Sequence, residues 1–533
     1  MRKRLSIVLA CAAIVGLLAS AAPAGASDKA GFDARQYLKE HGYLPLRGVA
    51  TLEAAKAHAE AVVAQQSSAP AAISGVLGAA ASVVSPDPSW QGISQSNVSP
   101  PDANGAIGPN SFIETVNVKI AIYNRSGGLL ASADFSSLTG NGSGSDPMVL
   151  WDPDTQRFYY NIWNTSNATM DWGFSKDANP TSLPGSFCRY ETGFGYATSS
   201  FPDYPKLGQT RDFLLIGVNF YPTSSSSAST SSDLLWISKP QGSAPVGDCP
   251  VAGTFGSGKV TGLTNSDLTQ TFTPVPAIQT DPSSTGYVLA MSDIECPPTC
   301  GTGTKLTVFT VTPNGATPPA PIVSAPNSIT VGSYQSPPDA PQKGTKRKLD
   351  TLDGRITHAV SGVHPIGSNP TTVWVSHTVL GGAGSQINWY EIDPAVTATV
   401  QQSGVVSSPT LYVLNSGISN DRTCNPSGCT HGGSMVLGFT TTSSSTYPAI
   451  QMVSKVGDSA QSAFVLVKQS STGDKNFTCN PGPCRWGDYG GATPDPAADA
   501  LALTGKVWLT NQWTTGGSIF SSGDQTWNWE ATP

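Results

Sequence analysis

Short apolar runs alternate with turn residues along most of the chain, and this alternation repeats. In each copy an apolar run meets an acidic or Gly/Pro-rich turn and then a second, aromatic-rich apolar run. The clearest copy spans residues 146–163 and reads DPMVLWDPDTQRFYYNIW. Runs of β-branched and aromatic residues between turn residues are typical of strands. Each copy therefore predicts two strands joined by a hairpin turn.

Seven such copies lie between residues 101 and 514. They begin near Pro101, Asp146, Asp203, Val275, His358, Ser434 and Trp486. Their mean separation is roughly 64 residues, which leaves room for four strands and their loops. Repeated four-stranded units predict an all-β fold, a β-propeller of six or seven blades over residues 89–533. Two separate β-sandwiches are the alternative, because a sheet can also cover its face against one partner sheet.

The first 88 residues follow other patterns and predict three segments. Residues 1–26 begin with the basic run Arg2–Arg4, continue with an apolar stretch and end at the small residues 24–26, as a signal peptide does. Residues 27–66 predict a helical pre-segment, and residues 67–88, rich in Ala, Ser and Pro, predict a linker. We therefore expect a secreted, soluble, extracellular protein, with an uncleaved membrane anchor as the alternative.

Two helices are predicted within the pre-segment. Asp33 can cap a first helix that runs to His41, and Thr51 can cap a second with the sequence LEAAKAHAEAVVAQQ. One face of the second helix is weakly apolar and consists of Leu52, Ala55, Ala59, Val62 and Val63. Such a face suits docking on a larger body. A pro-segment or a linker stalk fits the same pattern.

The composition limits the choice of partners. Only 12% of the residues are charged, the formal net charge is −7, and the chain holds 55 Gly and 42 Pro. A chain without general basic character is a poor match for nucleic acid or an anionic membrane. After residue 26 no stretch is apolar enough to span a bilayer. We expect a monomer that neither binds nucleic acid nor inserts into a membrane.

The cysteines predict disulfides. Of nine cysteines, Cys11 lies in the predicted signal peptide, which leaves an even number. Three pairs are close in sequence and a fourth pair remains: Cys296/Cys300, Cys424/Cys429, Cys479/Cys484 and Cys188/Cys249. Asn-Pro in CNPSGC and CNPGPC initiates a turn that can bring the sulfurs together. Zinc is the alternative, and it would need reduced thiolates with further ligands nearby.

Three blocks of sequence resemble a known group of proteins. They are SPPDANGAIGPNSFIETVNVKIAIYN at 99–124, LDTLDGRITHAVSGVHPIGSNPTTVWVSHTVLGGAGSQINWYEI at 349–392, and CRWGDYGGATPDPAADALALTGKVWLTNQWT at 484–514. Together they resemble bacterial secreted proteins, mostly uncharacterised, that are related to sialidase-like (BNR/Asp-box) β-propellers. The resemblance implies a six- or seven-bladed secreted propeller and little about chemistry, because one fold hosts many functions. The Arg-Ile-Pro element of sialidases is absent, so no catalytic residue is transferred from that family.

The densest group of candidate ligand-binding residues is Arg485, Trp486, Asp488 and Tyr489. Near the start of an inner strand they would lie at one mouth of a central channel. Trp486 could stack on a sugar, Asp488 could bind its hydroxyls, and Arg485 could pair with a charge. In the structural alternative, Asp488 accepts backbone N–H bonds in a tight turn, Arg485 pairs with it and Trp486 packs between blades.

A second group of candidates lies at 355–391. Arg355 and His377 are candidate ligand-binding residues, and Glu391 with Asp488 forms a candidate catalytic pair. Glycoside hydrolysis needs two carboxyl groups about 5–9.5 Å apart. His377 lies within a strongly strand-like run, where a hydrogen-bonded packing role is the alternative.

Metal and cofactor signals are weak. The candidate calcium ligands Asp102, Asn104, Asp152 and Asp154 match only fragments of oxygen-ligand loops. Asp and Asn are also ordinary hairpin-turn residues. No nucleophile elbow, phosphate loop or His-Glu-x-x-His helix is present. We expect no cofactor, with Ca2+ as the alternative.

These patterns favour a secreted propeller that binds an extracellular ligand, a glycan or another surface polymer, at a mouth of the ring. A saccharide-cleaving hydrolase or lyase is the second hypothesis and requires two opposed carboxylates. A non-catalytic interaction scaffold is the third, and it predicts a channel filled by apolar side chains.

Overall fold

The structure is a computed structural model that describes residues 49–67, 87–142, 144–226, 229–240, 248–292, 294, 301–368, 370–480 and 482–533. The predicted signal peptide 1–26, the helix predicted from Asp33 and most of the linker predicted at 67–88 lie outside the described residues. The second predicted helix is present as α2 (Val49–Ser67). None of the described helices combines the length and the apolarity that a membrane crossing requires.

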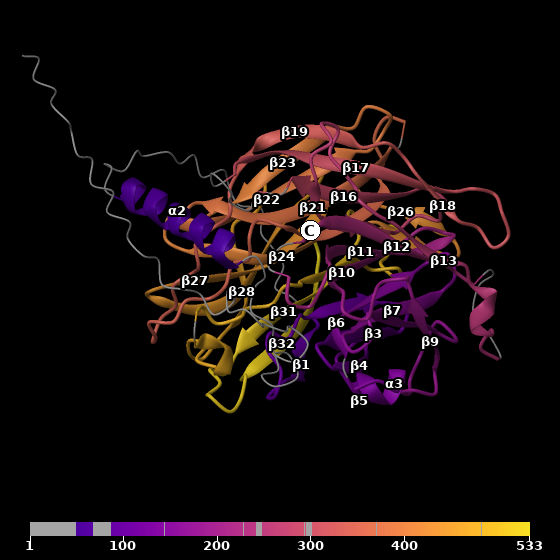
Figure 1. Ribbon diagram of the computed structural model, residues 1–533, viewed down its shortest axis with the longest axis horizontal. Helices are drawn as coiled ribbons and strands as arrows, with labels where there is room; N and C mark the ends of the chain where they lie inside the picture. The colour runs from indigo at the N-terminus through magenta and orange to yellow at the C-terminus, as the bar shows by residue number, and fades with distance from the viewer. Residues whose placement is uncertain are drawn as a thin grey trace, which may run out of the picture.

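Within the described residues, seven sheets of four or five strands follow one another along the chain and form a seven-bladed β-propeller; their pairing is antiparallel except that β15 runs parallel to β20. Figure 1 shows the chain running around the ring from indigo through magenta and orange to yellow. Each blade begins with its innermost strand, so the inner strands enter the ring from the same face. The fold class predicted from the repeated hairpins is confirmed.

The first four blades use β2 to β19. Blade 1 consists of β2 (Asn104–Ile107), β3 (Ser111–Val116), β4 (Lys119–Asn124) and β5 (Leu129–Asp134). Blade 2 consists of β6 (Gly144–Asp152), β7 (Arg157–Asn164), β8 (Thr169–Ser175) and β9 (Phe187–Gly193). Blade 3 consists of β10 (Phe201–Gln209), β11 (Phe213–Tyr221), β12 (Ser231–Ser238) and β13 (Ser257–Val260). Blade 4 consists of β14 (Thr271–Pro276), β16 (Gly286–Ser292), β17 (Gly303–Pro313), β18 (Pro321–Val323) and β19 (Asn327–Tyr334).

The last three blades use the remaining strands. Blade 5 consists of β15 (Ile278–Gln279), β20 (Ile356–Val363), β21 (Thr371–Gly381), β22 (Gly384–Asp393) and β23 (Thr399–Val406). Blade 6 consists of β24 (Tyr412–Asn420), β27 (Met435–Ser443), β28 (Thr446–Lys455) and β29 (Val465–Gln469). Blade 7 consists of β30 (Gly491–Pro494), β31 (Val507–Thr514), β32 (Asp524–Ala531) and β1 (Ser89–Ser94). A short hairpin, β25 (Thr423–Asn425) and β26 (Gly428–Thr430), a five-residue helix α3 (Phe135–Thr139) and two 3₁₀ turns (Ala252–Thr254 and Phe477–Cys479) lie between strands.

The sequence pattern located most of the blades. The hairpin predicted at 146–163 is β6 and β7, and the carboxylate of Asp152 accepts backbone N–H bonds from Asp154 and Thr155 in the turn between them. The segment predicted to begin near Ser434 is an exception. It is β27, the second strand of blade 6, whereas the inner strand is β24. β24 has polar residues in its centre (LNSGIS), so it does not stand out as an apolar run.

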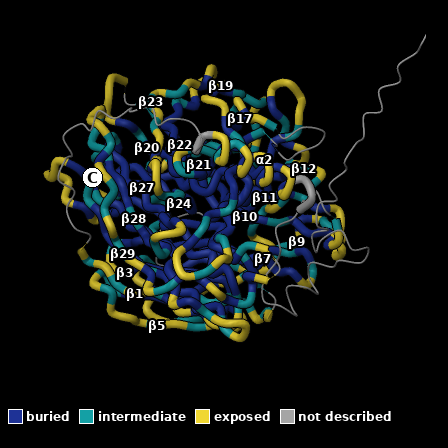
Figure 2. Tube along the Cα trace, turned by 90° about the vertical axis from the view of Figure 1, so that its left-hand side faces the viewer, coloured by how far each residue is buried: buried dark blue, intermediate teal, exposed yellow. Residues whose placement is uncertain are grey.

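Each pair of neighbouring blades encloses its own apolar cluster. Trp163 packs between blades 2 and 3, Trp374 stacks on Trp389 between blades 5 and 6, and Trp508 lies between blades 7 and 1. Figure 2 shows buried residues gathered in the middle of the molecule and exposed residues along its rim. Because a four-stranded sheet covers its two faces only against its neighbours, closing the ring gives every blade two partners.

The ring closes where the two ends of the described propeller meet in blade 7. β1 pairs with β32 in the register Ser89↔Trp529 and Trp90↔Asn528, and Figure 1 shows indigo β1 beside yellow β32. Glu114 on β3 of blade 1 forms hydrogen bonds with both strands of this closure. Its carboxylate accepts hydrogen bonds from the backbone N–H of Ile93, the hydroxyl of Thr526 and the amide of Asn528. Burial raises the pKa of Glu114.

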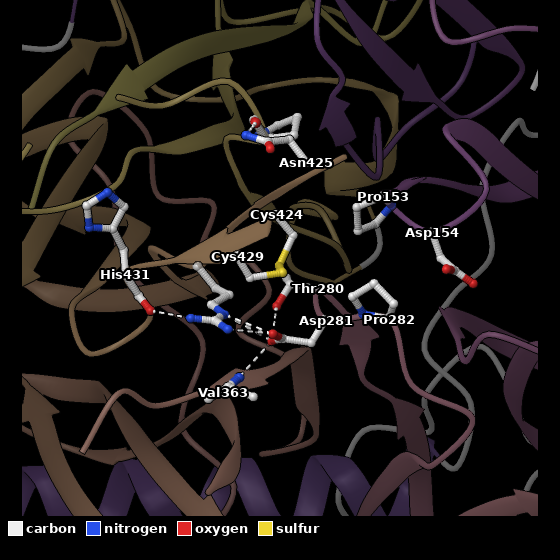
Figure 3. The surroundings of a disulfide bond; sticks show 12 residues. Pro153, Asp154, Thr280, Asp281, Pro282, Val363, Cys424, Asn425, Cys429 and His431 are labelled. Carbon is white, nitrogen blue, oxygen red and sulfur yellow. Dashed lines mark hydrogen bonds and ion pairs between the residues drawn. A yellow bond between two sulfur atoms is a disulfide. The ribbon is translucent and has the colours of Figure 1, made fainter. Parts of the chain in front are cut away.

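Three of the four predicted disulfides are present. Cys188 bonds to Cys249, Cys424 to Cys429, and Cys479 to Cys484. Figure 3 shows the Cys424–Cys429 bond on the hairpin β25–β26, beside Asp281. The sulfurs are bonded to each other, so these cysteines offer no thiolate to zinc. Cys296 and Cys300 lie outside the described residues.

We predict that the closure depends on Glu114. Glu114→Ala leaves a buried N–H, a hydroxyl and an amide without an acceptor, and we expect the free energy of unfolding to fall by about 3 kcal/mol. Urea denaturation at pH 7 measures this value. Glu191→Ala is the matched control, because exposed Glu191 also accepts two side-chain hydrogen bonds and its loss should cost less than about 1 kcal/mol. Equal losses of unfolding free energy in the two variants would contradict the role of Glu114 in closing the ring.

The disulfides should differ in their contribution to stability. Cys188 and Cys249 are 61 residues apart and Cys424 and Cys429 only five. In the chain-entropy model the long loop stabilises by about 4 kcal/mol and the short one by about 2 kcal/mol. Replacing each pair by serines and comparing urea midpoints at equal slope tests this order. A larger loss from the short-loop variant would contradict it.

Candidate functional site

Five inner strands carry the same irregularity near their start. The pairing register shifts between Ser145 and Met148 in β6, with equivalent shifts in β10, β14, β20 and β24. In four of these bulges a non-glycine residue has a positive φ: Asp146 (57°), Tyr204 (58°), Thr273 (51°) and Asn415 (53°). Bulges redirect side chains, and left-handed non-glycine residues concentrate at functional sites. The bulges therefore place the candidate site at the end of the ring where the inner strands begin.

Polar and charged side chains meet there, at the ring axis. We call this group the axial cluster; it consists of Asp102, Asp146, Tyr204, Lys206, Arg355, Arg485, Asp488 and Tyr489. They come from the starts of β6 and β10 and from the segments that lead into β2, β20 and β30. Lys206 is fully buried and Asp488 is 8% exposed, whereas Asp146 is only partly buried.

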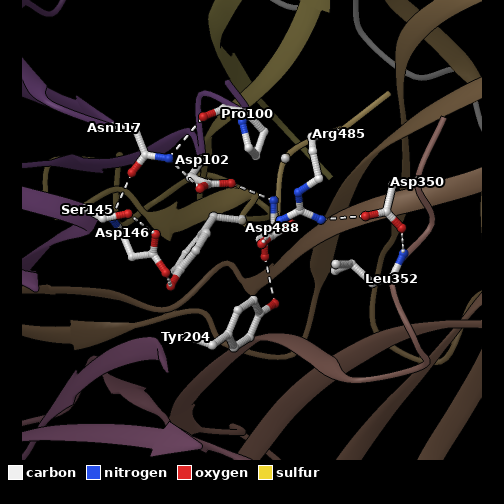
Figure 4. Close-up of polar contacts among 12 residues, drawn as sticks. Pro100, Asp102, Asn117, Ser145, Asp146, Tyr204, Asp350, Leu352, Arg485 and Asp488 are labelled. Atoms are coloured by element: carbon white, nitrogen blue, oxygen red, sulfur yellow. Dashed lines mark hydrogen bonds and ion pairs between the residues drawn. The ribbon is translucent and has the colours of Figure 1, made fainter. Parts of the chain in front are cut away.

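Asn117 joins two of the acids. Its amide nitrogen donates to Oδ2 of Asp102 at 2.6 Å, and its amide oxygen accepts the backbone N–H of Asp146 at 2.7 Å. The other oxygen of Asp102 accepts the backbone N–H of Asp488 at 2.7 Å. Figure 4 shows this network from Pro100 to Asp488. Three carboxylates from three blades are thus held near one another by bonds between residues far apart in sequence.

Lys206 lies between two tyrosine rings. Its Nζ is 3.3 Å from the ring centroid of Tyr489 and 4.0 Å from that of Tyr204. Both Nζ of Lys206 and the hydroxyl of Tyr204 donate to the carbonyl oxygen of Asp488, at 3.2 and 2.7 Å. Burial lowers the pKa of Lys206 well below its usual range, although the nearby acids oppose the shift. The aromatic faces stabilise the ammonium form by cation–π attraction.

Two arginines complete the axial cluster. Arg485 donates to Oδ2 of Asp488 at 2.6 Å and forms a second ion pair with Asp350. The other oxygen of Asp488, Oδ1, is buried and has no hydrogen-bond partner in the described structure. Arg355 pairs with Asp353 and lies 4.4 Å from the ring centroid of Tyr204. The site therefore contains a free acceptor beside two fixed guanidinium groups.

The acids of the axial cluster hold protons more tightly than free aspartate. Burial, followed by the charges of Asp488 and Asp146, raises the pKa of Asp102 well above its usual range. Burial and the neighbouring Asp203 raise the pKa of Asp146 to about 7. Near neutral pH, Asp146 can therefore either donate or accept a proton. Such perturbed pairs are characteristic of functional sites.

The structure brings together part of the predicted site. Arg485, Asp488, Tyr489 and Arg355 all lie in the axial cluster. Trp486 does not: it is 1% exposed, packs on Leu349 and Leu414, and donates its indole N–H to Thr440 at 3.2 Å. The indole of Trp486 is therefore covered in this structure and exposes no face on which a sugar could stack.

Glu391 and His377 lie within blade 5. Glu391 on β22 is 1% exposed and is bound by His364 at 2.5 Å, Thr372 at 2.8 Å and Gln402 at 2.5 Å. These three side chains hold the carboxylate of Glu391 within blade 5, and no contact joins it to the axial cluster in the described structure. His377 on β21 contacts the carbonyl oxygen of Gly354 at 2.9 Å, and burial lowers its pKa to about 4. It is a neutral packing histidine rather than a ligand-binding residue.

The candidate metal ligands do not converge. Asp102 belongs to the axial cluster, whereas Oδ1 of Asn104 accepts the backbone N–H of Val149. Asp152 forms the turn described above and an ion pair with Lys239 at 2.6 Å, and Asp154 pairs with Arg211. Two sets of possible ligand atoms, around Asp281 and Asp474, each include two disulfide-bonded cysteines. For the described residues, turn and ion-pair roles account for these acids.

The sequence pattern missed Tyr204, Lys206 and the role of Asp146. A signal for them exists, because the dipeptides Asp146-Pro147, Tyr204-Pro205 and Thr273-Pro274 occupy the equivalent bulge in three successive blades. In these three strands a polar or aromatic residue stands before a proline at the bulge, and in the first two of them it belongs to the axial cluster. Proline at this point also removes a backbone donor, which a regular ladder would need.

Comparison with known proteins adds little to the assignment of a function. No protein-family model and no curated protein sequence matches the chain. Among solved structures, an ACO/RPE65 chimera aligns with 69% of this chain and 71% of its own at 10% identity and a TM-score of 0.36. An exo-β-1,3-galactanase from Phanerochaete chrysosporium aligns with 84% of this chain and 98% of its own at 12% identity and a TM-score of 0.28. Similarity at this level carries no functional argument, and the resemblance to sialidase-like proteins stays a prediction.

The raised pKa of Asp146 predicts a pH-dependent stability. The folded protein holds this proton up to about pH 7, whereas the unfolded chain releases it near pH 3.8. The wild type should therefore lose stability relative to Asp146→Asn as the pH rises from about 4 to 7, by up to about 4 kcal/mol. Urea denaturation of both proteins at intervals across this range measures the difference. A constant difference would contradict the raised pKa, and Asp134→Asn on the exposed edge of β5 is the control.

Proposed function

We propose that this protein is a secreted β-propeller that binds an extracellular glycan or another surface polymer at the axial cluster. The observation that carries the proposal is the concentration of buried, charged and hydrogen-bonding groups at the ring axis. Seven apolar clusters already pack the blades against one another. Buried charges are costly to fold and are retained mainly where they have a function.

The chemistry of the cluster suits a polyhydroxylated ligand. A sugar hydroxyl both donates and accepts, so its site must supply both kinds of partner. Oδ1 of Asp488 is an acceptor without a hydrogen-bond partner, and Asp146, whose pKa is raised to about 7, can supply a donor. A cluster of this polarity does not fit an inert scaffold, for which the axis would be filled by apolar side chains.

Binding should depend on Asp146, the partly exposed acid of the cluster. With wild-type protein, a panel of neutral, amino and acidic oligosaccharides should contain at least one binder. For that binder we expect Asp146→Asn to raise Kd by at least tenfold, a loss of about 1.4 kcal/mol. Titration calorimetry measures Kd, and Asp134→Asn should stay within twofold of the wild type. No binder in the panel, or equal binding by both variants, would contradict the proposal.

Saccharide cleavage is the second candidate, and the raised pKa of Asp146 is the observation that favours it. A carboxylic acid that titrates near pH 7 is suited to general acid catalysis. Glu391 is bound by three side chains of blade 5, so we propose Asp102 or Asp488, which lie in the axial cluster, as the carboxyl group that acts with Asp146. Release of reducing ends from the bound oligosaccharide, lost at least 100-fold in Asp146→Asn, would indicate an enzyme. Binding without release would leave the protein a binding module.

A further inference from the structure

Helix α2 is held against the propeller mainly by a lysine. Its buried apolar residues are small apart from one: Leu52, Ala55 and Ala59. Lys56 lies on the same face and is only 7% exposed. Figure 1 shows α2 outside the ring of strands, near β22. Val62 and Val63 of the same face are half-buried. A face this small gains little from apolar burial, so the polar contacts of Lys56 carry much of the docking.

The ammonium group of Lys56 has a complete set of acceptors. Its Nζ pairs with Asp339, and it donates to Oδ1 of Asp350 at 3.2 Å and to the hydroxyl of Thr351 at 3.1 Å. An ammonium group has three N–H donors, and three acceptors meet it here. We call Asp339, Asp350 and Thr351 the ammonium pocket. All three belong to the loop 335–355 of the propeller, so the pocket remains when the helix leaves.

The ammonium pocket is directly connected to the axial cluster. Asp350 uses its second oxygen to bind Arg485, and Arg485 binds Asp488. Figure 4 shows Arg485 between Asp350 and Asp488. A ligand that bound the axial cluster and carried a cation at one end could therefore reach the pocket. The unpartnered Oδ1 of Asp488, a residue that is 8% exposed, is a second acceptor on this path.

Loss of Lys56 from the pocket would leave buried carboxylates without a cation. Asp350 has no exposed side-chain surface, and that of Asp339 is 15% exposed. Removing one partner of a buried ion pair is strongly destabilising. The helix can therefore leave readily only when another cation takes its place. A primary amine fits best, because the pocket offers separate single acceptors rather than the planar pair that a guanidinium prefers.

We propose that the ammonium pocket is a recognition site for the primary amine of an amino-sugar glycan, and that Lys56 occupies it until such a ligand displaces helix α2. The proposal rests on the proposed function, since it names the class of glycan that the axial cluster takes. When no such ligand is bound, Lys56 of helix α2 fills the ammonium pocket.

Hydrogen exchange of the full chain tests displacement. Glucosamine trimer should increase the exchange rate of amides in residues 52–65 at least tenfold, because it competes with Lys56. N-acetylglucosamine trimer, which lacks the amine, should leave the rate within twofold at the same ionic strength. Equal effects of the two trimers, or no effect of glucosamine trimer, would overturn the proposal.

Two variants separate the amine from the rest of the ligand. Lys56→Met removes the internal competitor, so Kd for glucosamine trimer should fall at least tenfold. Asp339→Asn removes one acceptor of the pocket, so the preference for glucosamine trimer over its N-acetyl form should fall at least tenfold. Glu60→Gln is the control, because it removes an exposed ion pair between the same helix and Lys348. It should change neither the Kd for glucosamine trimer nor the preference over the N-acetyl form by more than twofold. An unchanged preference in Asp339→Asn would overturn the proposal.

The two proposals fail in different ways. If neutral oligosaccharides bind in an Asp146-dependent manner and glucosamine trimer has no advantage, the ammonium pocket is refuted and glycan binding stands. If glucosamine trimer displaces α2 and no oligosaccharide binding depends on Asp146, the pocket stands and binding at the axial cluster is refuted.

Discussion

The structure depends on one constraint: every blade must cover both faces of its sheet against a neighbour. Each of the seven interfaces has its own cluster of buried apolar residues. The ring satisfies this constraint only if its first and last blades meet. The pairing of β1 with β32, sealed by Glu114, makes that contact between residues more than 400 positions apart. Closure is therefore a condition for the burial of all the other faces.

Once the interfaces between blades supply the stability, the axis is free to carry polar groups. Bulges in the inner strands β6 and β10 direct Asp146 and Tyr204 toward the ring axis. A regular ladder would alternate their side chains between the two sheet faces and bury them in the apolar interfaces. The bulges therefore connect the backbone geometry to the chemistry of the axial cluster.

A series of ion pairs connects the ring axis to the N-terminal helix α2. Lys56, Asp350, Arg485 and Asp488 form an alternating series of cations and anions, and each member is buried. In such a series the position of one charge depends on its neighbours, because each would be costly to bury alone. The helix, the loop 335–355 and the segment before β30 are thereby fixed together. The same linkage gives a ligand at the axis a physical means of affecting α2.

The sequence by itself determined what depends on local pattern: the hairpins, the all-β class, the helix from Leu52 onward, and the close cysteine pairs. Strand periodicity, helix propensity and short disulfide loops act within a few residues, so one chain segment contains the whole signal. It also singled out Arg485, Asp488 and Tyr489, because a dense group of chemistry-bearing residues is visible in one dimension. The tertiary structure alone decided that Trp486 is buried, that Glu391 is bound by side chains of its own blade, and that Lys206 lies between two tyrosines. These roles arise from contacts between residues separated in the chain, some within one blade and others between blades, and only the folded ring brings them within reach of one another.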